Sequence, residues 1–429
     1  MSTEKTLHPD EKVKAGTLGK RLAGAGAAIL VIFLILSIIL GASKGDHWRR
    51  FFHAYVIGWS FVASIAIGSL FFVIIHHLVR AQWSTVVRRL AEIVTGSFPL
   101  LFVVGLGFII PVAAGYDGLY YWGHHDAHHA ANHHLHGKLG WLSGGAFALR
   151  YAIYFAIYIG LSRYFAGTSR KQDESGDEAL SEKMRIAAGP MVILYGITTV
   201  FFGFDILMSL QPKWYSTIYS VNFWGGAMIG AYATLALLAM AVQRSGRLTR
   251  SITVEHYQDL GKWVFAYTFF WAYTAFSQFM LIWYANIPEE TIFYKYRMFS
   301  EWKWLSIAIT VGHWAFPFVF LLSRWTKRIL PVFTFFCVWQ LGFHWLDLYW
   351  NVMPNINWST VTPPGGAPFV GGPLMGNPAD HTIGFSPVDV TMWVAMIGAL
   401  LAGIGLAMKG NLIPVRDPKL GKSLAFENF

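Results

Sequence analysis

Six ionisable side chains stand inside long apolar stretches of this sequence, where a charge is costly and a functional reason is expected. Five of them are carboxylates or imidazoles, which can exchange protons, and the sixth is a guanidinium. They are Asp205, Asp347, Asp389, His313, His344 and Arg150. A two-electron, two-proton oxidation of a quinol needs this mixture. An aspartate or histidine accepts the hydroxyl proton, while an arginine or histidine donates a hydrogen bond to the quinone carbonyl. The six residues are candidates for a quinol site or a proton pathway.

Structural roles are open for the same residues. Arg150 and Asp205 could form an ion pair that holds two adjacent helices together. Asp205 and Asp347 could simply face interfacial water near the ends of their helices. His313 and His344 could hold a haem between two helices, although their estimated depths differ and the chain has no second such pair.

Asp205 and Asp347 share a context that favours the functional alternative. Asp205 precedes Pro212 by seven positions, and Asp347 precedes Pro354 by seven. A proline ends a helix, and irregular backbone persists at membrane depth only where protein or water covers it. We therefore predict that both aspartates belong to a proton or quinol site that opens toward the periplasm.

Two further segments carry unusual composition. His124–Gly137 holds seven histidines, whose spacing on a helix would permit zinc or copper binding, but it lies in a loop without cysteine. A loop that contacts a partner is the alternative, and we expect no metal there. Asn355–Ser386 is rich in Gly and Pro and is typical of an extended cover over a neighbouring subunit, or of an idle surface loop.

Cysteine usage limits the redox chemistry of the chain. Cys337 is the single cysteine, which excludes intrachain disulfides, cysteine-ligated iron–sulfur clusters and CxxCH haem attachment. We expect this chain to bind no haem and no cluster, so any such centre must belong to a partner.

The composition identifies the elements that position these residues. Of the 429 residues, 55% are hydrophobic and 13% are charged, and apolar runs long enough to cross a bilayer recur throughout. Strict alternation is absent, which excludes a β-barrel pattern. We predict an all-α integral membrane protein with about ten transmembrane helices: Leu22–Ser43, Ala54–Leu78, Glu92–Ala114, Ser143–Phe165, Ala187–Leu210, Tyr219–Val242, Lys262–Ala285, Trp302–Leu322, Leu330–Met353 and Pro387–Met408. Counting residues along these spans places His313 near the middle and the other five candidates in the outer third.

The distribution of positive charge predicts the orientation. Most of the 33 Lys and Arg fall in the tails, 1–21 and 409–429, and in the even-numbered loops, while none lies between Arg328 and Lys409. Both termini are therefore predicted to be cytoplasmic. The net charge of +10 is mostly a topology signal and gives no reason to expect nucleic acid.

Short strings recur in the same order along the chain. Leu161-Ser162-Arg163-Tyr164 matches Leu322-Ser323-Arg324-Trp325, and Gly203-Phe204-Asp205 matches Gly342-Phe343-His344. The order predicts two related four-helix bundles, about 54–210 and 219–353, with the first and last spans peripheral. Because four spans separate the copies, the repeat is parallel, which counts against the inverted repeats common in secondary transporters.

The segment Phe202–Ser220, FGFDILMSLQPKWYSTIYS, resembles the fifth-span signature of the NrfD-like membrane subunits, in particular the ActF type of alternative complex III. The similarity lies in Asp205, in Met208-Ser209-Leu210 with Pro212 and Trp214, and in Ser216-Thr217-Ile218-Tyr219. The His-bearing loop and the charged linker that follows the fourth span also resemble this family. The resemblance covers almost the whole chain.

This resemblance implies a subunit of a quinol:cytochrome c oxidoreductase in the bacterial inner membrane. It implies a paralogous NrfD-like subunit, an iron–sulfur subunit and c-type cytochrome subunits as partners, with lipids around them. In that family the paralogue is usually assigned the working quinol pocket. This chain is then a quinone-site or proton-pathway scaffold without catalysis of its own. The alternatives are a non-catalytic anchor for peripheral redox subunits and a secondary transporter.

Overall fold

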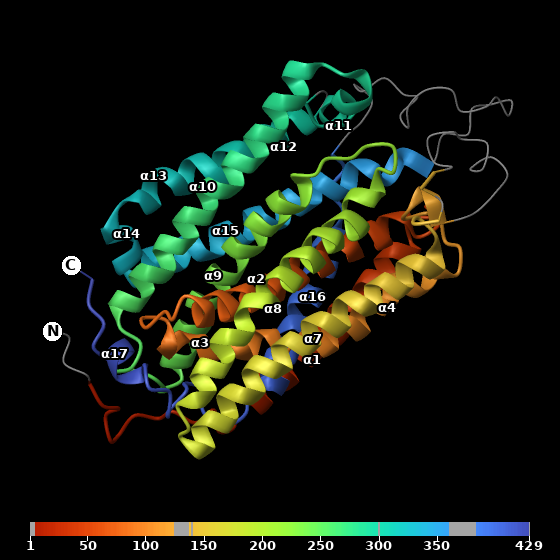
Figure 1. Ribbon diagram of the computed structural model, residues 1–429. Coiled ribbons are helices and arrows are strands. Elements are labelled where there is room, and N and C mark those ends of the chain that lie inside the picture. Colours follow the sequence, from red (N-terminus) through yellow and green to blue (C-terminus); the bar gives the residue numbers. More distant parts are fainter. Residues whose placement is uncertain (1–4, 124–136, 139, 299–300, 360–382, 429) are drawn as a thin grey trace, which may run out of the picture.

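The fold of this chain is built from helices, as its apolar runs predict. The computed structural model describes residues 5–123, 137–138, 140–298, 301–359 and 383–428 (Figure 1). Within these ranges the β pairing consists of one isolated bridge between Lys14 and Asn411. The all-α class is therefore confirmed. The α-helices are α1 (Leu18–Ala42), α2 (Arg49–Leu78), α3 (Thr85–Thr95), α4 (Phe98–Ala113), α7 (Gly144–Ser175), α8 (Ala179–Ile206), α9 (Tyr219–Arg244), α10 (Val254–Ala285), α11 (Pro288–Met298), α12 (Trp302–Ile309), α13 (Phe316–Leu322), α14 (Arg324–Arg328), α15 (Leu330–Val352), α16 (Pro387–Ala407) and α17 (Leu420–Leu424).

Short irregular helices adjoin several of these elements. Three are single stretches of 3-10 helix: η1 (Tyr121–Gly123), η2 (Met208–Leu210) and η4 (Met353–Ser359). The fourth, η3 (Thr310–Ala315), is a π-helix that joins α12 to α13 within one continuous span. Irregular turns therefore follow both α8 and α15, at the positions where Pro212 and Pro354 predict an end to the helix.

Eight helical segments of the described chain are long and apolar enough to cross a membrane, so a multi-pass membrane protein is supported. They are Leu18–Ala42, Arg49–Leu78, Thr85–Ala113, Gly144–Ser175, Ala179–Leu210, Tyr219–Arg244, Trp302–Leu322 and Pro387–Ala407. The two other predicted spans correspond to α10 and α15, which have 32 and 23 residues but many Trp, Tyr and polar side chains. That these two also cross stays a prediction.

Two predicted boundaries differ from the structure. The third span is two helices, α3 and α4, separated at Gly96 and Ser97, because Pro99 favours the start of a new helix and cannot continue an old one. The charged segment Lys171–Lys183, predicted as a solvated cytoplasmic linker, is largely exposed but mostly helical: α7 runs on to Ser175 and α8 begins at Ala179.

Helices α2 and α9 lie at the centre of the bundle and pack against each other. Around them, α4, α7 and α8 contact α2, whereas α10 and α15 contact α9. The α2 window is 94% buried inside the chain, but that of α1 is only 11% buried. Helix α15 also contacts α2, and α8 contacts α9, so contacts cross between the two predicted halves. The halves and their relation as a repeat both stay predictions.

The first and last spans, predicted as peripheral, pack on each other through glycines. A Cβ at Gly26 of α1 would lie 2.3 Å from the backbone nitrogen of Ala402, and one at Gly405 of α16 would lie 2.3 Å from that of Ala23. Only glycine permits this approach of two backbones, a common device of membrane helix pairs.

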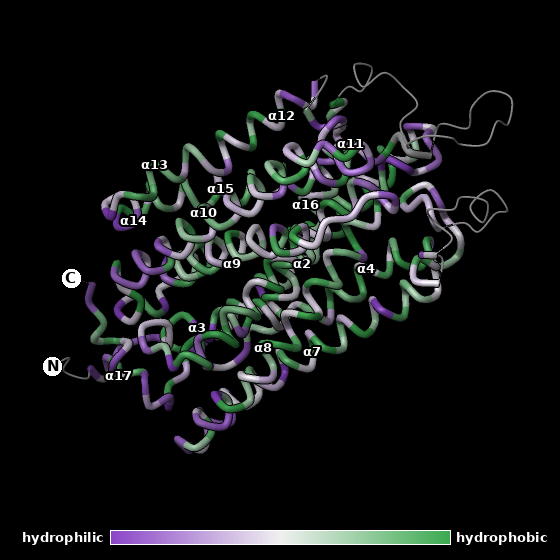
Figure 2. Tube along the Cα trace, turned by 45° about the horizontal axis from the view of Figure 1, so that its top comes forward, coloured by the Kyte–Doolittle hydropathy of each residue, from purple (hydrophilic) through white to green (hydrophobic). Residues whose placement is uncertain are grey.

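Both chain termini lie at the same end of the bundle, beside α14 and α17, and α11 lies at the opposite end (Figure 1). We call the first the terminal end. Hydrophilic segments gather toward the two ends, with hydrophobic helix between them (Figure 2). The N-terminal segment before α1 packs on the C-terminal segment after α16, as the Lys14–Asn411 bridge shows.

Candidate functional site

Asp205 is buried on the last turn of α8, and every side of its carboxylate is occupied. Arg150 of α7 donates from Nε to Oδ2 at 2.6 Å and from Nη2 to Oδ1 at 3.1 Å. Trp141 Nε1 donates to Oδ1 at 2.9 Å, and the Tyr154 hydroxyl donates to Oδ2 at 2.6 Å. Four donors match the roughly four lone-pair sites of a carboxylate. Of the alternatives open in the sequence, this geometry favours an ion pair that joins α7 to α8.

Asp347, the predicted counterpart on α15, has a different environment. It is 5% exposed and accepts from Trp271 Nε1 at 3.2 Å and from Asn351 Nδ2 at 3.3 Å. Both donors are neutral and both bonds are long. Within the described chain no cation forms an ion pair with Asp347. A buried carboxylate held this loosely can take up a proton without breaking an ion pair.

His344 lies one turn before Asp347 and is held against the central helix α2. Its Nε2 is 2.8 Å from Ser64 Oγ, which itself donates its single hydrogen to the Phe61 carbonyl at 2.7 Å. Nε2 of His344 must therefore carry the hydrogen of that contact, which leaves Nδ1 as a bare lone pair. Nδ1 is buried and has no partner in the described chain.

Glycines of α9 make room for this imidazole. A Cβ at Gly226 would lie 2.8 Å from His344 Nδ1, and one at Gly230 would lie 3.4 Å from Cδ2. A side chain at position 226 would displace the ring. The sequence thus keeps space for an imidazole whose nitrogen faces α9.

His313 sits in the π-helix η3, a type of local distortion that often marks functional sites. Its Nδ1 is 2.8 Å from Gln340 Oε1. Gln340 Nε2 donates to Thr268 Oγ1 at 2.6 Å, and the Thr268 hydroxyl donates to the Val264 carbonyl. The amide orientation is thereby fixed, so Nδ1 of His313 donates and Nε2 is bare. That Nε2 is also buried without a partner.

These groups form one buried set, which we call the polar column. Trp271 connects its parts: its indole donates to Asp347, and its ring centroid is 4.4 Å from that of His313. The rings of His313 and His344 lie 6.4 Å apart and are nearly parallel, at 19°. The column comprises Ser64, Thr268, Trp271, His313, Gln340, His344 and Asp347. A carboxylate and two imidazoles with free acceptor nitrogens can receive, hold and pass on protons.

Asp389, the last of the candidates, lies outside this column. Its carboxylate accepts the Ser386 amide at the start of α16 and completes a capping box there. It also pairs with Arg50, whose Nε donates at 2.9 Å, and Arg50 donates further to the Tyr349 hydroxyl. Asp389 therefore fastens the start of α16 to α2.

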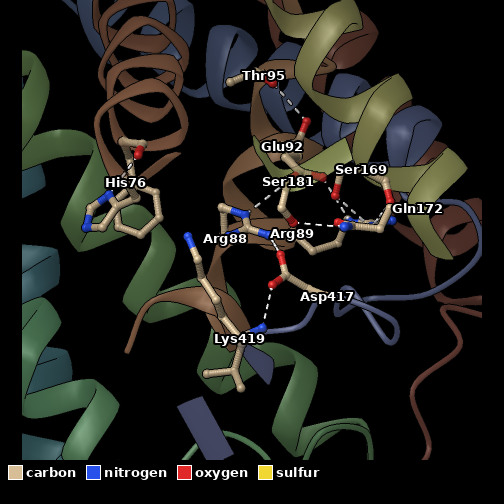
Figure 3. Close-up of polar contacts among 12 residues, drawn as sticks. His76, Arg88, Arg89, Glu92, Thr95, Ser169, Gln172, Ser181, Asp417 and Lys419 are labelled. Atoms are coloured by element: carbon tan, nitrogen blue, oxygen red, sulfur yellow. Dashed lines mark hydrogen bonds and ion pairs between the residues drawn. The ribbon is translucent and has the colours of Figure 1, made fainter. Parts of the chain in front are cut away.

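A second buried group of charges occupies the terminal end, and sequence reasoning assigned its arginines to a loop. Figure 3 shows Arg88 and Arg89 of α3 pointing toward Glu92 and Asp417. Arg88 pairs with Asp417, and Arg89 contacts Glu92 and Asp173 at 2.9 Å each. We call Arg88, Arg89, Glu92, Asp173 and Asp417 the terminal cluster. The spacing of Arg88 and Arg89 to Glu92, at i,i+4 and i,i+3 on a helix, is the signal that could have revealed it.

The terminal cluster fixes the C-terminal segment to α3. Burial raises the pKa of Asp417, but the Arg88 guanidinium outweighs it, so that the pKa lies below the usual range. A depressed carboxyl pKa stabilises the folded state above the ordinary titration range, and this contribution is lost only as the pH falls through the lowered value. At neutral pH the ion pair between Arg88 and Asp417 is therefore fully formed.

We expect Asp417→Asn to loosen the C-terminal segment, because Arg88 would keep only the 3.7 Å contact of its Nε with Glu92. Losing one partner of a buried ion pair costs about 3 kcal/mol. Limited proteolysis should cleave the variant near residue 417 faster than the unaltered chain. Asp10→Asn, at an exposed aspartate, is the control. Equal cleavage rates would show that the Arg88–Asp417 ion pair does not hold the C-terminal segment in place.

The described ranges contain no group of three or more His, Cys, Asp or Glu placed to hold a metal ion. The His124–Gly137 segment falls almost wholly outside the described residues, as does most of Asn355–Ser386. The metal and partner alternatives for these loops therefore stay predictions.

No protein-family model and no curated protein matches this chain.

Proposed function

We propose that this chain is a membrane subunit of a respiratory quinol:cytochrome c oxidoreductase of the alternative complex III type, and that its polar column carries protons. The sequence resemblance around Asp205 supports the kind of complex. The observation that carries the proton role is the buried polar column, in which Asp347, His313 and His344 keep acceptor capacity unused. A buried acceptor without a partner costs free energy, and proton transfer would give these three groups a use for that capacity.

Electrons, in this proposal, pass through partners. The iron–sulfur and c-type cytochrome subunits supply the redox centres, and a paralogous NrfD-like subunit lies beside this chain in the bacterial inner membrane. Quinol is bound at or near the interface with that paralogue. The chain itself holds protons, positions the column and anchors its neighbours.

Purification tests the assembly directly. An affinity tag on the C-terminus should recover the chain from native membranes together with c-type cytochromes, visible as a Soret band and a reduced-minus-oxidised haem signal. The same chain expressed alone should lack that band. Recovery of the tagged chain from native membranes without cytochromes would instead favour a transporter.

The anchor alternative has support of its own. Asp205, Asp389 and the terminal cluster all hold helices or the C-terminal segment in place. An anchor alone predicts that replacing residues of the polar column leaves turnover unchanged, which the variants proposed below decide.

The orientation gives a further prediction. Ser175, at the end of α7, should lie in the cytoplasm and Ser359 in the periplasm, because most positive charge lies on the side of the termini. In intact cells an impermeant thiol reagent should label Ser359→Cys and leave Ser175→Cys unlabelled, in a Cys337→Ser background. Strong labelling at 175 with none at 359 would reverse the orientation.

A further inference from the structure

The two imidazoles of the polar column share one arrangement of hydrogen bonds. Each is fully surrounded by protein, each uses one nitrogen as a hydrogen-bond donor, and each leaves the other nitrogen bare: His313 Nε2 and His344 Nδ1. A neutral imidazole with its donor nitrogen fixed is ready to accept a proton at the second nitrogen.

The surroundings fix these orientations from four elements. Ser64 on α2 holds His344, and Gln340 on α15 with Thr268 on α10 holds His313. Gly226 on α9 keeps the space beside His344 Nδ1 open. In both imidazoles, partners from distant parts of the chain engage one ring nitrogen and leave the other without a hydrogen bond.

The π-helix is a second feature that supports a functional role for His313. It shifts the helical register at His313, and the Trp339 indole donates at 2.7 Å to the Gly312 carbonyl beside it. A Cβ at Gly312 would lie 2.1 Å from Phe343 Cζ, so a larger residue there would have to displace the Phe343 ring. The distortion therefore has its own supporting contacts.

We propose that His313 and His344 form a proton-loading pair that holds a single proton between them. The inference rests on the proposed function and names the groups that load the column. The reason for one proton is distance: the ring centroids are 6.4 Å apart inside the bundle. At the effective dielectric constant of a protein interior, repulsion makes a second proton bind roughly 50- to 100-fold more weakly.

The step is a proton transfer without a redox change. A neighbouring donor gives up a proton, and the N–H bond forms at His344 Nδ1 or His313 Nε2 while the donor's bond breaks. The charged imidazolium then passes a proton on, toward water or Asp347, and returns to the neutral form. Because each ring has a fixed donor nitrogen, the loaded proton enters and leaves by the bare nitrogen.

Proton movement by the reconstituted complex tests this pair. His313→Gln, His344→Gln and the double variant would be compared in vesicles for protons moved per electron. We expect each single variant to lower this ratio at least tenfold, and the double variant to fall no further, since the two groups act as one unit. His76→Gln, a buried imidazole of α2 outside the column, should keep the ratio of the unaltered complex. Effects that multiply in the double variant, or unchanged ratios, would overturn the pair.

An infrared measurement separates this inference from the proposed function, because it needs no quinol activity. With isotopically labelled histidine, the full chain in lipid vesicles is taken through a pH change. The imidazole protonation signal should lose the same one-proton component in either single variant and in the double variant. Two separate components, one lost with each histidine, would overturn the pair even if the complex oxidises quinol. A shared component in a chain that recovers no cytochromes would keep the pair and refute the proposed complex.

Discussion

Asp347→Asn is expected to lower quinol-dependent cytochrome c reduction at least about tenfold while the complex still assembles. Asparagine keeps the shape of the side chain, and its amide oxygen can still accept from Trp271 or Asn351, whose bonds to Asp347 are long and neutral. What is lost is the ability to bind and release a proton. Because no ion pair of the described chain involves Asp347, the change leaves no buried charge without a partner.

The control for this variant is Asp259→Asn. Asp259 is a buried aspartate of α10 that lies at the terminal end and pairs with Lys262. Steady-state turnover of both variants, corrected for the amount of assembled complex, gives the comparison. An Asp347→Asn complex that assembles normally and turns over at the unaltered rate would remove Asp347 from the proton pathway and favour the anchor.

Asp205→Asn is expected to act on stability first. The variant leaves the largely covered Arg150 guanidinium, 12% exposed, without its carboxylate partner and weakens all four bonds to this position. Removing one partner of a buried ion pair costs about 3–5 kcal/mol. The amount of assembled complex and its thermal unfolding temperature should both fall.

Two further variants show whether the charge is responsible. Tyr154→Phe removes one donor to the charged Asp205 carboxylate and should cost about 1.5–3 kcal/mol, less than the loss of the whole ion pair. Arg150→Gln combined with Asp205→Asn removes both charges and should recover part of the lost stability, since no unpaired charge remains. An Asp205→Asn complex as stable as the unaltered one would show that the ion pair is not structural.

The sequence predicts the helices of this chain well, because long apolar runs leave the backbone no other way to satisfy its hydrogen bonds in lipid. Its predictions fail where polar residues interrupt the pattern. Arg88 and Arg89 look like loop residues, yet they lie buried in α3 because Asp173 and Asp417, far along the chain, neutralise them. The spacing of both arginines to Glu92 is a local signal for part of this cluster, but the contributions of Asp173 and Asp417 have none.

The candidate site, like the fold, could be predicted only in part from the sequence. Apolar surroundings identify His313, His344 and Asp347 as unusual from the sequence alone. Their roles depend on partners that only the fold brings near: Ser64 lies 280 positions from His344, and Trp271 lies 76 from Asp347. Likewise, the matching sequence contexts of Asp205 and Asp347 predict similar roles, but Arg150 reaches only Asp205. A shared sequence context therefore does not give the two aspartates the same electrostatic environment.

The central claim is that protons move through the polar column and not through Asp205. The most direct measurement is the number of protons moved per electron in vesicles that contain either the Asp347→Asn complex or the Arg150→Gln, Asp205→Asn complex. The double variant keeps a neutral pair in place of the ion pair and is expected to retain the ratio of the unaltered complex. Asp347→Asn is expected to lose proton movement at least about tenfold. The reverse pattern, with proton movement lost in the double variant and kept in Asp347→Asn, would contradict the account.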